Sequence, residues 1–305
     1  MTNQFSQETQ KKHITTETEE KLVALFTDEV EEKLVASLTG EIEEKWAASL
    51  TGETTELLPF LPYLLQDFWA LGCEPGIMVS LIKKHGSLTK DTKVLDLACG
   101  KGAVSIKLAK ELGIKVKGID LMSAFIEIAK QKADEYGVSE LCSFAVGEIN
   151  EAIKAERDYD FVVFGAAGNI LGTPSEMLSK LKATVKTGGF ILFDEGYLPD
   201  NCTQDDIRYN NYECFTKKQW FELFEEAGLI VVEAVLDTDL ASGDTQNLDS
   251  TSGMEAITLR ANELIFKYPD KKEMFEGYIQ SQQNEYDDVD HTLASVTWIL
   301  QKTSA

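Results

Sequence analysis

The sequence predicts an α/β fold with a doubly wound, mainly parallel sheet, and three observations lead to this class. Apolar segments alternate with amphipathic ones from Lys93 onward, as strands and helices do in such folds. The segment VLDLACGKGAVSIKLAKEL (94–112) joins a short strand, a loop of small residues and the start of a helix. The next strand ends on Asp120, about 20 residues after that loop. Together these features form a nucleotide cradle, with Asp120 placed to hold a pair of ribose hydroxyls.

Each element follows from its local pattern. The segment YDFVVFGAA (159–167) is apolar on both faces, as a central parallel strand should be. Ser123 is suited to cap the helix that follows the second strand. The expected strands are 93–98, 116–120, 142–148, 159–167 and 188–198, a sixth in the second half of 217–237, and a last one at 293–302. One expected helix ends near residue 112, two more span 123–136 and 174–186, and a fourth begins the 217–237 segment. A helical insert is expected at about 253–285.

Composition argues against several classes of protein. The chain has 305 residues, 43% of them hydrophobic, which is enough for one large α/β domain with additions. Its five cysteines show no C-x-x-C pair and no spacing shared with histidines, so we expect neither a metal site nor a disulfide framework. The net charge of −23 opposes binding to nucleic acid and anionic membranes and fits a neutral or cationic small molecule, although solubility explains it equally well. Without an apolar membrane-length run or an N-terminal signal core, we expect a cytoplasmic protein.

The loop after the first strand carries a family resemblance. DLACGKG (96–102) resembles the first motif of the class I S-adenosylmethionine-dependent methyltransferases, which usually reads D/E-x-G-x-G-x-G. Ala98 replaces the first glycine, and alanine is small enough for the turn if its φ is negative. The dinucleotide fingerprint G-x-G-x-x-G fits less well, because Ser105 stands at its third glycine. The resemblance covers roughly residues 57–302 and implies a Rossmann-like seven-stranded sheet with an antiparallel last strand and S-adenosylmethionine as cofactor.

The resemblance also implies a role for each strand end. Asp96 would reach the methionine part of the cofactor, and Asp120 would hold the ribose with both carboxylate oxygens. Leu121 and Met122 would lie against the adenine, and Glu148 would accept a hydrogen bond from its amino group. The predicted cofactor-binding residues are Asp96, Ala98, Cys99, Gly100, Gly102, Asp120, Leu121, Met122, Gly147, Glu148, Ile149 and Gly165.

The chain divides into three predicted units. Residues 54–90 form an N-terminal helical lid, in which Tyr63, Gln66 and Trp69 share one helix face and would line the substrate pocket. Residues 91–305 form the cofactor-binding domain. Residues 1–53 contain three 12-residue units, ETEEKLVALFTD, EVEEKLVASLTG and EIEEKWAASLTG, each acidic at its start and apolar later. They predict an acidic, mobile appendage; a protein-docking or homo-oligomerisation arm is the alternative.

The chemistry implied by the resemblance needs few protein groups. Methyl transfer is an in-line displacement at a carbon that the cofactor has already activated, so the protein supplies alignment and a dry pocket. A general base is needed only if the acceptor is protonated at neutral pH. The candidates for this base are Asp194, Glu195, Tyr197 and Tyr63. We therefore expect a methyltransferase that acts on a nitrogen, oxygen or sulfur atom of a small molecule. The alternatives are a non-catalytic cofactor-binding scaffold and a nicotinamide-dependent oxidoreductase.

Overall fold

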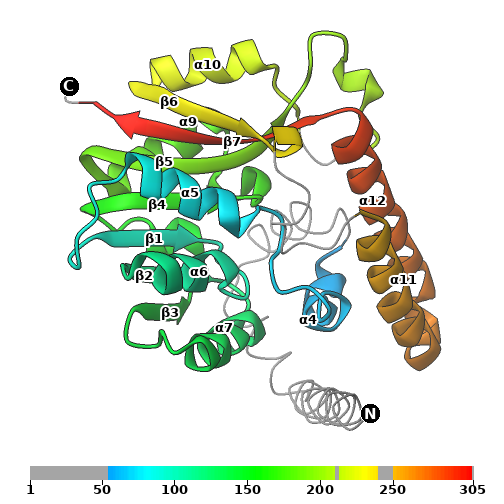
Figure 1. Ribbon diagram of the computed structural model, residues 1–305. Coiled ribbons are helices and arrows are strands. Elements are labelled where there is room, and N and C mark those ends of the chain that lie inside the picture. Colours follow the sequence, from blue (N-terminus) through cyan, green and yellow to red (C-terminus); the bar gives the residue numbers. More distant parts are fainter. Residues whose placement is uncertain (1–53, 210–212, 240–249, 304–305) are drawn as a thin grey trace, which may run out of the picture.

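A computed structural model describes residues 54–209, 213–239 and 250–303, and Figure 1 shows a single twisted sheet at its centre. The sheet has seven strands in the order β3-β2-β1-β4-β5-β7-β6. The first five strands pair in parallel, and β7 runs antiparallel to both β5 and β6. The strands are β1 (Lys93–Leu97), β2 (Lys115–Asp120), β3 (Cys142–Val146), β4 (Tyr159–Gly165), β5 (Val185–Tyr197), β6 (Leu229–Leu236) and β7 (Ala294–Lys302). The predicted fold class is confirmed, and the predicted arm at 1–53 lies outside the described residues.

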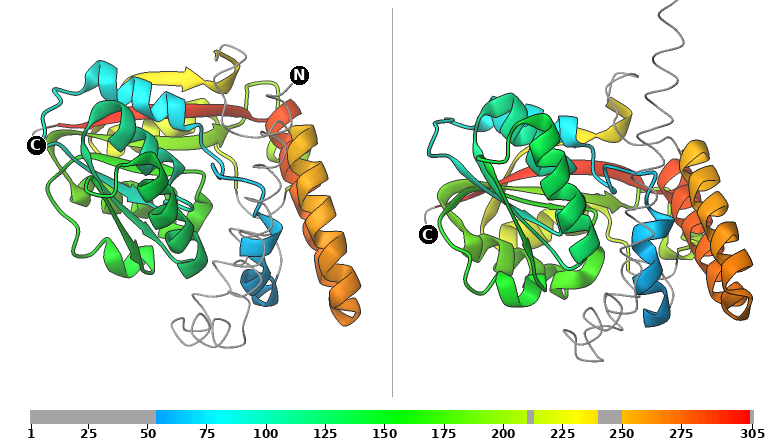
Figure 2. Two further views of the ribbon diagram at one scale, coloured as in Figure 1. Left: turned by 60° about the horizontal axis from the view of Figure 1, so that its bottom comes forward. Right: turned by 90° about the horizontal axis from the view of Figure 1, so that it is seen from below.

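Helices cover both faces of the sheet (Figure 2). One face carries α5, α6 and α7, whose apolar sides join one buried cluster with the strands. The other face carries α8, α9 and α10, which contribute to a second cluster. The helices are α5 (Pro75–His85), α6 (Ala103–Leu112), α7 (Ser123–Tyr136), α8 (Ile149–Ala152), α9 (Pro174–Thr184) and α10 (Lys217–Glu226). Short 3-10 helices are η2 (Gly168–Leu171), η3 (Gln204–Asp206) and η4 (Asp237–Asp239). Ser123 is the first residue of α7 rather than its cap, a position taken by Met122.

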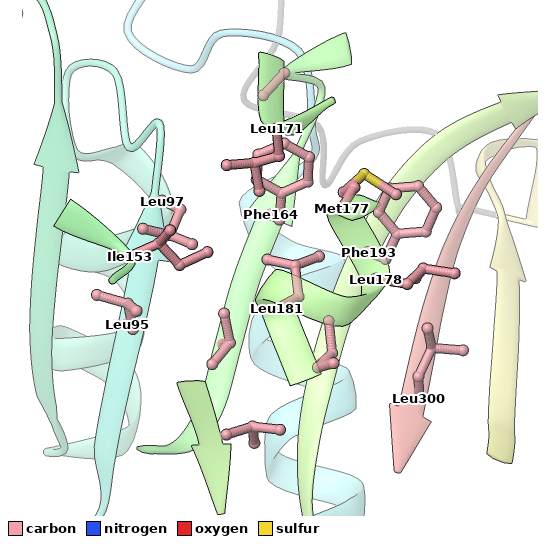
Figure 3. Packing of buried hydrophobic residues seen from close by; sticks show 14 of the residues in the cluster. Leu95, Leu97, Ile153, Phe164, Leu171, Met177, Leu178, Leu181, Phe193 and Leu300 are labelled. Carbon is pink, nitrogen blue, oxygen red and sulfur yellow. The ribbon is translucent and has the colours of Figure 1, made fainter. Parts of the chain in front are cut away.

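Interdigitated aliphatic and aromatic side chains form the core between the sheet and α9 (Figure 3). Phe164 on β4 and Phe193 on β5 stack with ring centroids 6.5 Å apart. Leu178 and Leu181 of α9 are fully buried in the same cluster. Each such side chain contributes roughly 1.5–3 kcal/mol through burial. This core holds the strand ends, and therefore the site above them, in place.

A helical cap stands at one side of the sheet in both views of Figure 2. We define it as residues 55–64 and 250–291, which comprise η1 (Thr55–Phe60), α4 (Leu61–Leu64), α11 (Ser250–Lys267), η5 (Pro269–Lys271) and α12 (Lys272–His291). These elements share an apolar cluster in which Leu57, Leu64 and Phe275 are fully buried. Met122 and Phe125, from the end of β2 and from α7, join this cluster and connect the cap to the sheet. The insert before β7 extends a few residues beyond the predicted 253–285 at both ends.

The described residues contain neither a membrane-spanning helix nor a cluster of metal-binding side chains. None of the helices in these ranges is both long and apolar enough to span a membrane. Among the same residues, no group of three or more His, Cys, Asp and Glu side chains is arranged to hold a metal ion.

Candidate active site

The loop between β1 and α6 turns sharply because several of its residues have left-handed backbone conformations. The φ angles are +57° at Ala98, +52° at Gly100 and +75° at Gly102. The condition of a negative φ at Ala98 is therefore not met. A non-glycine residue in this region costs about 1–2 kcal/mol, so the loop accepts backbone strain at Ala98 to bring its amide groups to the end of the sheet.

The carboxylate of Asp120 lies directly against this loop. The backbone N–H of Gly100 donates to Asp120 Oδ2 at 2.8 Å, and the N–H of Met122 donates to Oδ1 at 2.8 Å. Burial raises the pKa of Asp120 to about 6, although the backbone donors lower it in part. A carboxylate has about four acceptor positions, so Asp120 keeps capacity for a further donor such as a ribose hydroxyl.

Asp96, at the end of β1, is a second buried carboxylate beside the loop. Ser105 Oγ donates to Asp96 Oδ2 at 2.6 Å from the first turn of α6. Burial raises the pKa of Asp96 to about 7; the Ser105 hydroxyl opposes this shift, and the charge of Asp120 adds to it. Sequence reasoning missed Ser105 as a partner. Its signal was a hydroxyl residue at the position where the dinucleotide fingerprint has a glycine.

Several predicted residues meet around one small cavity at this place. The cavity has a volume of about 30 Å³ and lies between the loop and residues 69–73. The predicted residues that line it are Trp69, Asp96, Ala98, Cys99, Gly100 and Gly165. The structure thus joins the strand end, the loop and part of the predicted lid in one site.

Other predicted cofactor residues surround the site but pack into the cores. Leu121 and Ile149 belong to the cluster between the sheet and α9, and Met122 belongs to the cap cluster. A Cβ on Gly102 would come within 2.9 Å of Ala129 and Phe144, so this glycine is required for close packing. Gly147 donates its N–H to the Asp120 carbonyl oxygen at 2.9 Å. The side chains of Leu121, Met122 and Ile149 are buried, and their contact with adenine stays a prediction.

Glu148 has a local role in the structure, and its predicted adenine contact stays a prediction. Its Oε1 accepts from the backbone N–H of Asn150 at 2.8 Å, and its Oε2 accepts from that of Glu151 at 3.0 Å. The Asn150 side chain donates to Oε1 as well, at 2.9 Å. This carboxylate therefore caps α8, as acidic N-cap residues do.

The predicted lid face is only partly correct. Helix α4 ends at Leu64, so Tyr63, Gln66 and Trp69 do not share a helix face. Tyr63 Oη donates to Glu263 Oε2 on α11 at 2.7 Å, whereas Trp69 Nε1 donates to the Lys101 carbonyl at 3.3 Å. The side-chain nitrogen of Gln66 is buried and has no hydrogen-bond partner among the described residues. Of the three, Trp69 alone lines the cavity.

Among the candidate bases, Asp194 is placed beside the cavity. It pairs with Gly165 across β4 and β5, and Thr297 Oγ1 donates to its Oδ2. Burial raises the pKa of Asp194 to about 7 and that of Glu195 to about 7, with neighbouring carboxylates adding to both shifts. Such values suit a proton acceptor near neutral pH. Tyr197 instead packs against Trp298, with ring centroids 6.3 Å apart, and Tyr63 is engaged by α11.

Lys101 is the principal site residue that sequence reasoning missed. It stands between the two loop glycines and is only 2% exposed. Its Nζ donates to the carbonyl oxygens of Leu65 and Phe68. Burial lowers the pKa of Lys101 to about 7, and the Asp67 carboxylate partly opposes this shift. The available signal was a cationic residue in a loop otherwise built from small ones.

Comparison with known proteins agrees with this geometry. Residues 88–228 match the family described as methyltransferase domain. The putative methyltransferase YqeM of Bacillus subtilis is 34% identical over 143 residues, which are 46% of this chain and 51% of YqeM. A ribosomal protein L11 methyltransferase of an Exiguobacterium species is 29% identical over 100 residues, 33% of this chain and 31% of that protein. The chain thus spans about half of the first of these relatives and less of the second.

A solved structure extends the likeness to most of the fold. The S-adenosylmethionine-dependent methyltransferase of Thiobacillus denitrificans, crystallised with S-adenosyl-L-homocysteine, superposes with a TM-score of 0.64 at 20% identity. The superposition covers 80% of this chain and 98% of that one. Residues 88–228 are thus similar to a methyltransferase domain, and the described chain has the fold of that solved methyltransferase structure, with the seven-stranded sheet and antiparallel β7 that the DLACGKG resemblance implied.

Proposed function

We propose that the protein transfers a methyl group from S-adenosylmethionine to a nitrogen, oxygen or sulfur atom of a small molecule. The observation that carries this proposal is the 2.8 Å hydrogen bond between Gly100 N and Asp120 Oδ2. It brings the glycine loop and the acid of the next strand together at the carboxyl-terminal edge of the sheet, where open α/β sheets bind ligands. The complex of the Thiobacillus denitrificans structure with S-adenosyl-L-homocysteine supports the choice of cofactor.

The residues present suit the chemical groups of this cofactor. Asp120 keeps acceptor capacity for ribose hydroxyls, and Asp96 offers a buried carboxylate to an ammonium group. An ammonium placed beside Asp96 would lower the pKa of that carboxyl and keep it ionised. The bound cofactor supplies the activated methyl group, so the protein has to align the acceptor and exclude water. Asp194 would take the proton of an acceptor that is protonated at neutral pH.

Two observations favour a small-molecule acceptor. Residues 69–73 close the loop side of the site, leaving about 30 Å³ there, and a net charge of −23 repels polyanions. We test the acceptor class by incubating the full chain with methyl-labelled S-adenosylmethionine and a deproteinised metabolite extract or, separately, a protein extract. Label in the small-molecule fraction supports the proposal. Label only in precipitated protein would contradict it, and cofactor binding without any transfer would favour a scaffold.

The cofactor site is tested by replacing Asp120 with Ala and titrating S-adenosylhomocysteine calorimetrically. Loss of the carboxylate removes the acceptor for the ribose and for the Gly100 amide. We expect the dissociation constant to rise by about 30- to 160-fold, corresponding to roughly 2–3 kcal/mol for hydrogen bonds to a charged group. Asp91→Ala, an exposed acid before β1, is the matched control and should bind normally. Equal affinity of both variants would refute the assignment of this crevice.

A further inference from the structure

A buried lysine joins the glycine loop to the segment that covers it. We call residues 65–73 the strap. Lys101 reaches from the loop into the strap, where its Nζ donates to the carbonyl oxygen of Phe68 at 2.5 Å and to that of Leu65. In return, Trp69 Nε1 of the strap donates to the Lys101 carbonyl at 3.3 Å. The loop and the strap are thus linked by hydrogen bonds in both directions.

The surroundings of Lys101 make these bonds necessary. Its side chain is 2% exposed, and the Phe125 ring of α7 lies 5.5 Å from Nζ. A buried ammonium that lost its acceptors would be left without compensation for its lost hydration. The two carbonyl groups follow the short helix α4, where a cation is also favoured by the backbone dipoles. Protonated Lys101 therefore favours the closed position of the strap.

The strap in this position fills the crevice in front of the loop. Gly72 lies so close to the end of β4 that an added Cβ would come within 2.1 Å of Ala166 Cβ. The Cys73 sulfur would likewise lie 2.8 Å from a Cβ added at Gly165. The remaining cavity of about 30 Å³ compares with roughly 300–1,000 Å³ for usual ligand pockets. A nucleoside-sized ligand cannot reach Asp96 unless the strap moves.

The two sides of the strap are fastened differently. On the cap side, the Arg260 guanidinium binds both oxygens of Asp67, with N–O distances of 2.7 and 3.0 Å. This is a bidentate pair between α11 and the strap, and arginine keeps its charge at any working pH. On the loop side, the link is a lysine whose pKa is lowered to about 7. Of the two links, only the one to the loop can lose its charge near neutral pH.

We propose that Lys101 is a latch that controls cofactor exchange: it fastens the strap over the glycine loop, and the cofactor enters and leaves when these bonds open. Lys101 acts here as a positioning residue, because it holds the strap rather than the reacting atoms. This inference rests on the proposed function for the identity of the ligand. The strap's fastening itself can be measured without any ligand.

The test compares Lys101→Met with Lys110→Met in the full-length protein. Methionine keeps the length of the side chain and removes its donors. Lys110 is the control because it also donates to a backbone carbonyl, that of Tyr136 at 3.0 Å, but lies outside the crevice. Stopped-flow tryptophan fluorescence follows S-adenosylhomocysteine binding and release. We expect both rate constants to rise about ten-fold or more in Lys101→Met, since hydrogen bonds to a charged group contribute about 1.5–3 kcal/mol, and to stay unchanged in Lys110→Met.

A pH profile separates a latch from a merely structural lysine. The release rate of the wild type should rise as pH passes through about 7, because a neutral amine holds the strap carbonyls less strongly. The charged group that acts on Lys101 is Asp67 on the strap, and α7 presents the Phe125 ring. Asp96 lines the same small cavity as Lys101, and Asp120 accepts from the neighbouring Gly100 amide. Because these acids are present in both proteins, the difference between the wild-type and Lys101→Met profiles isolates Lys101.

Hydrogen exchange of the unliganded protein gives a second readout. Amides of residues 65–73 should exchange faster in Lys101→Met than in Lys110→Met, while those of β4 keep their protection. If Lys101→Met does not fold, Trp69→Phe removes the reciprocal bond and part of the ring contact with Tyr136, and it should give a smaller increase in hydrogen exchange of the strap. Unchanged release and exchange in the variant that is measured would overturn the latch. Absence of S-adenosylhomocysteine binding in the wild type would instead overturn the proposed function. Hydrogen exchange alone would then show whether Lys101 holds the strap.

Discussion

The sheet and the helical cap are held together by different kinds of contact. The sheet buries apolar side chains from all of its central strands on both faces, and Phe164, Phe193 and Trp298 have almost no exposed surface. The cap has a cluster of its own, which includes Met122 and Phe125 from the sheet side. Between the two regions, the strap is held by polar links to Lys101 and Arg260. The sheet therefore fixes the glycine loop and Asp120, whereas the strap covers the loop and is tied to the cap by Arg260.

Truncating one buried ring in each region tests this comparison most strongly. Phe193→Ala should lower the free energy of unfolding by about 3–5 kcal/mol, because it empties a volume among Phe164, Trp220 and Trp298. Phe275→Ala, in the cap, should first increase hydrogen exchange of α11 and α12 while β4 and β5 stay protected. Urea unfolding and residue-resolved exchange measure the two effects. Loss of protection in the sheet at the same rate in Phe275→Ala would mean that the two regions unfold as one.

A pH series tests where the buried charge lies. Asp96, Asp194 and Glu195 have pKa values raised to about 7, and Asp120 to about 6, all at the carboxyl-terminal edge of the sheet. The folded protein thus keeps protons that the unfolded chain has lost, so the free energy of unfolding falls as pH rises from about 4 to about 7. Lys101 changes the free energy of unfolding in the opposite direction. Because its pKa is lowered in the folded protein, this free energy rises as pH rises from about 7 toward 10.5.

Urea unfolding of the unliganded protein between pH 5 and 8 measures this dependence. Asp96→Asn should reduce the slope, since it removes one titrating group and keeps the side-chain shape. A free energy of unfolding that increases steadily from pH 5 to pH 7 would contradict the assignment of buried, uncompensated carboxylates to this edge.

The smallest expected effect concerns the strained loop residue. Ala98→Gly should relieve the left-handed conformation at φ +57° and raise the free energy of unfolding by about 1 kcal/mol. Ala103→Gly, in the first turn of α6, should change stability in the opposite direction, because glycine weakens a helix by about 1 kcal/mol. Thermal unfolding of the two variants checks the signs. A lower stability in Ala98→Gly would show that the loop strain has been misjudged.

Local patterns were sufficient to predict the sheet and the position of Asp120. Alternating apolar segments reflect burial on two faces, and the spacing from the glycine loop to Asp120 is set by one helix and one strand. The end of α4 at Leu64 and the burial of Lys101 could not be predicted in this way. Both depend on contacts between the strap and a loop more than 30 residues later. Glu148 shows the same limit, because a motif position does not reveal whether a carboxylate will cap its own helix.

The most direct test of the central claim is a crystal structure of the full chain with S-adenosylhomocysteine. We expect both ribose hydroxyls within hydrogen-bond distance of the Asp120 carboxylate. The amino-acid end of the ligand should lie beside Asp96 and the loop at 98–102. A nucleoside bound elsewhere on the sheet, or one that leaves Asp120 bonded to backbone amides alone, would contradict it.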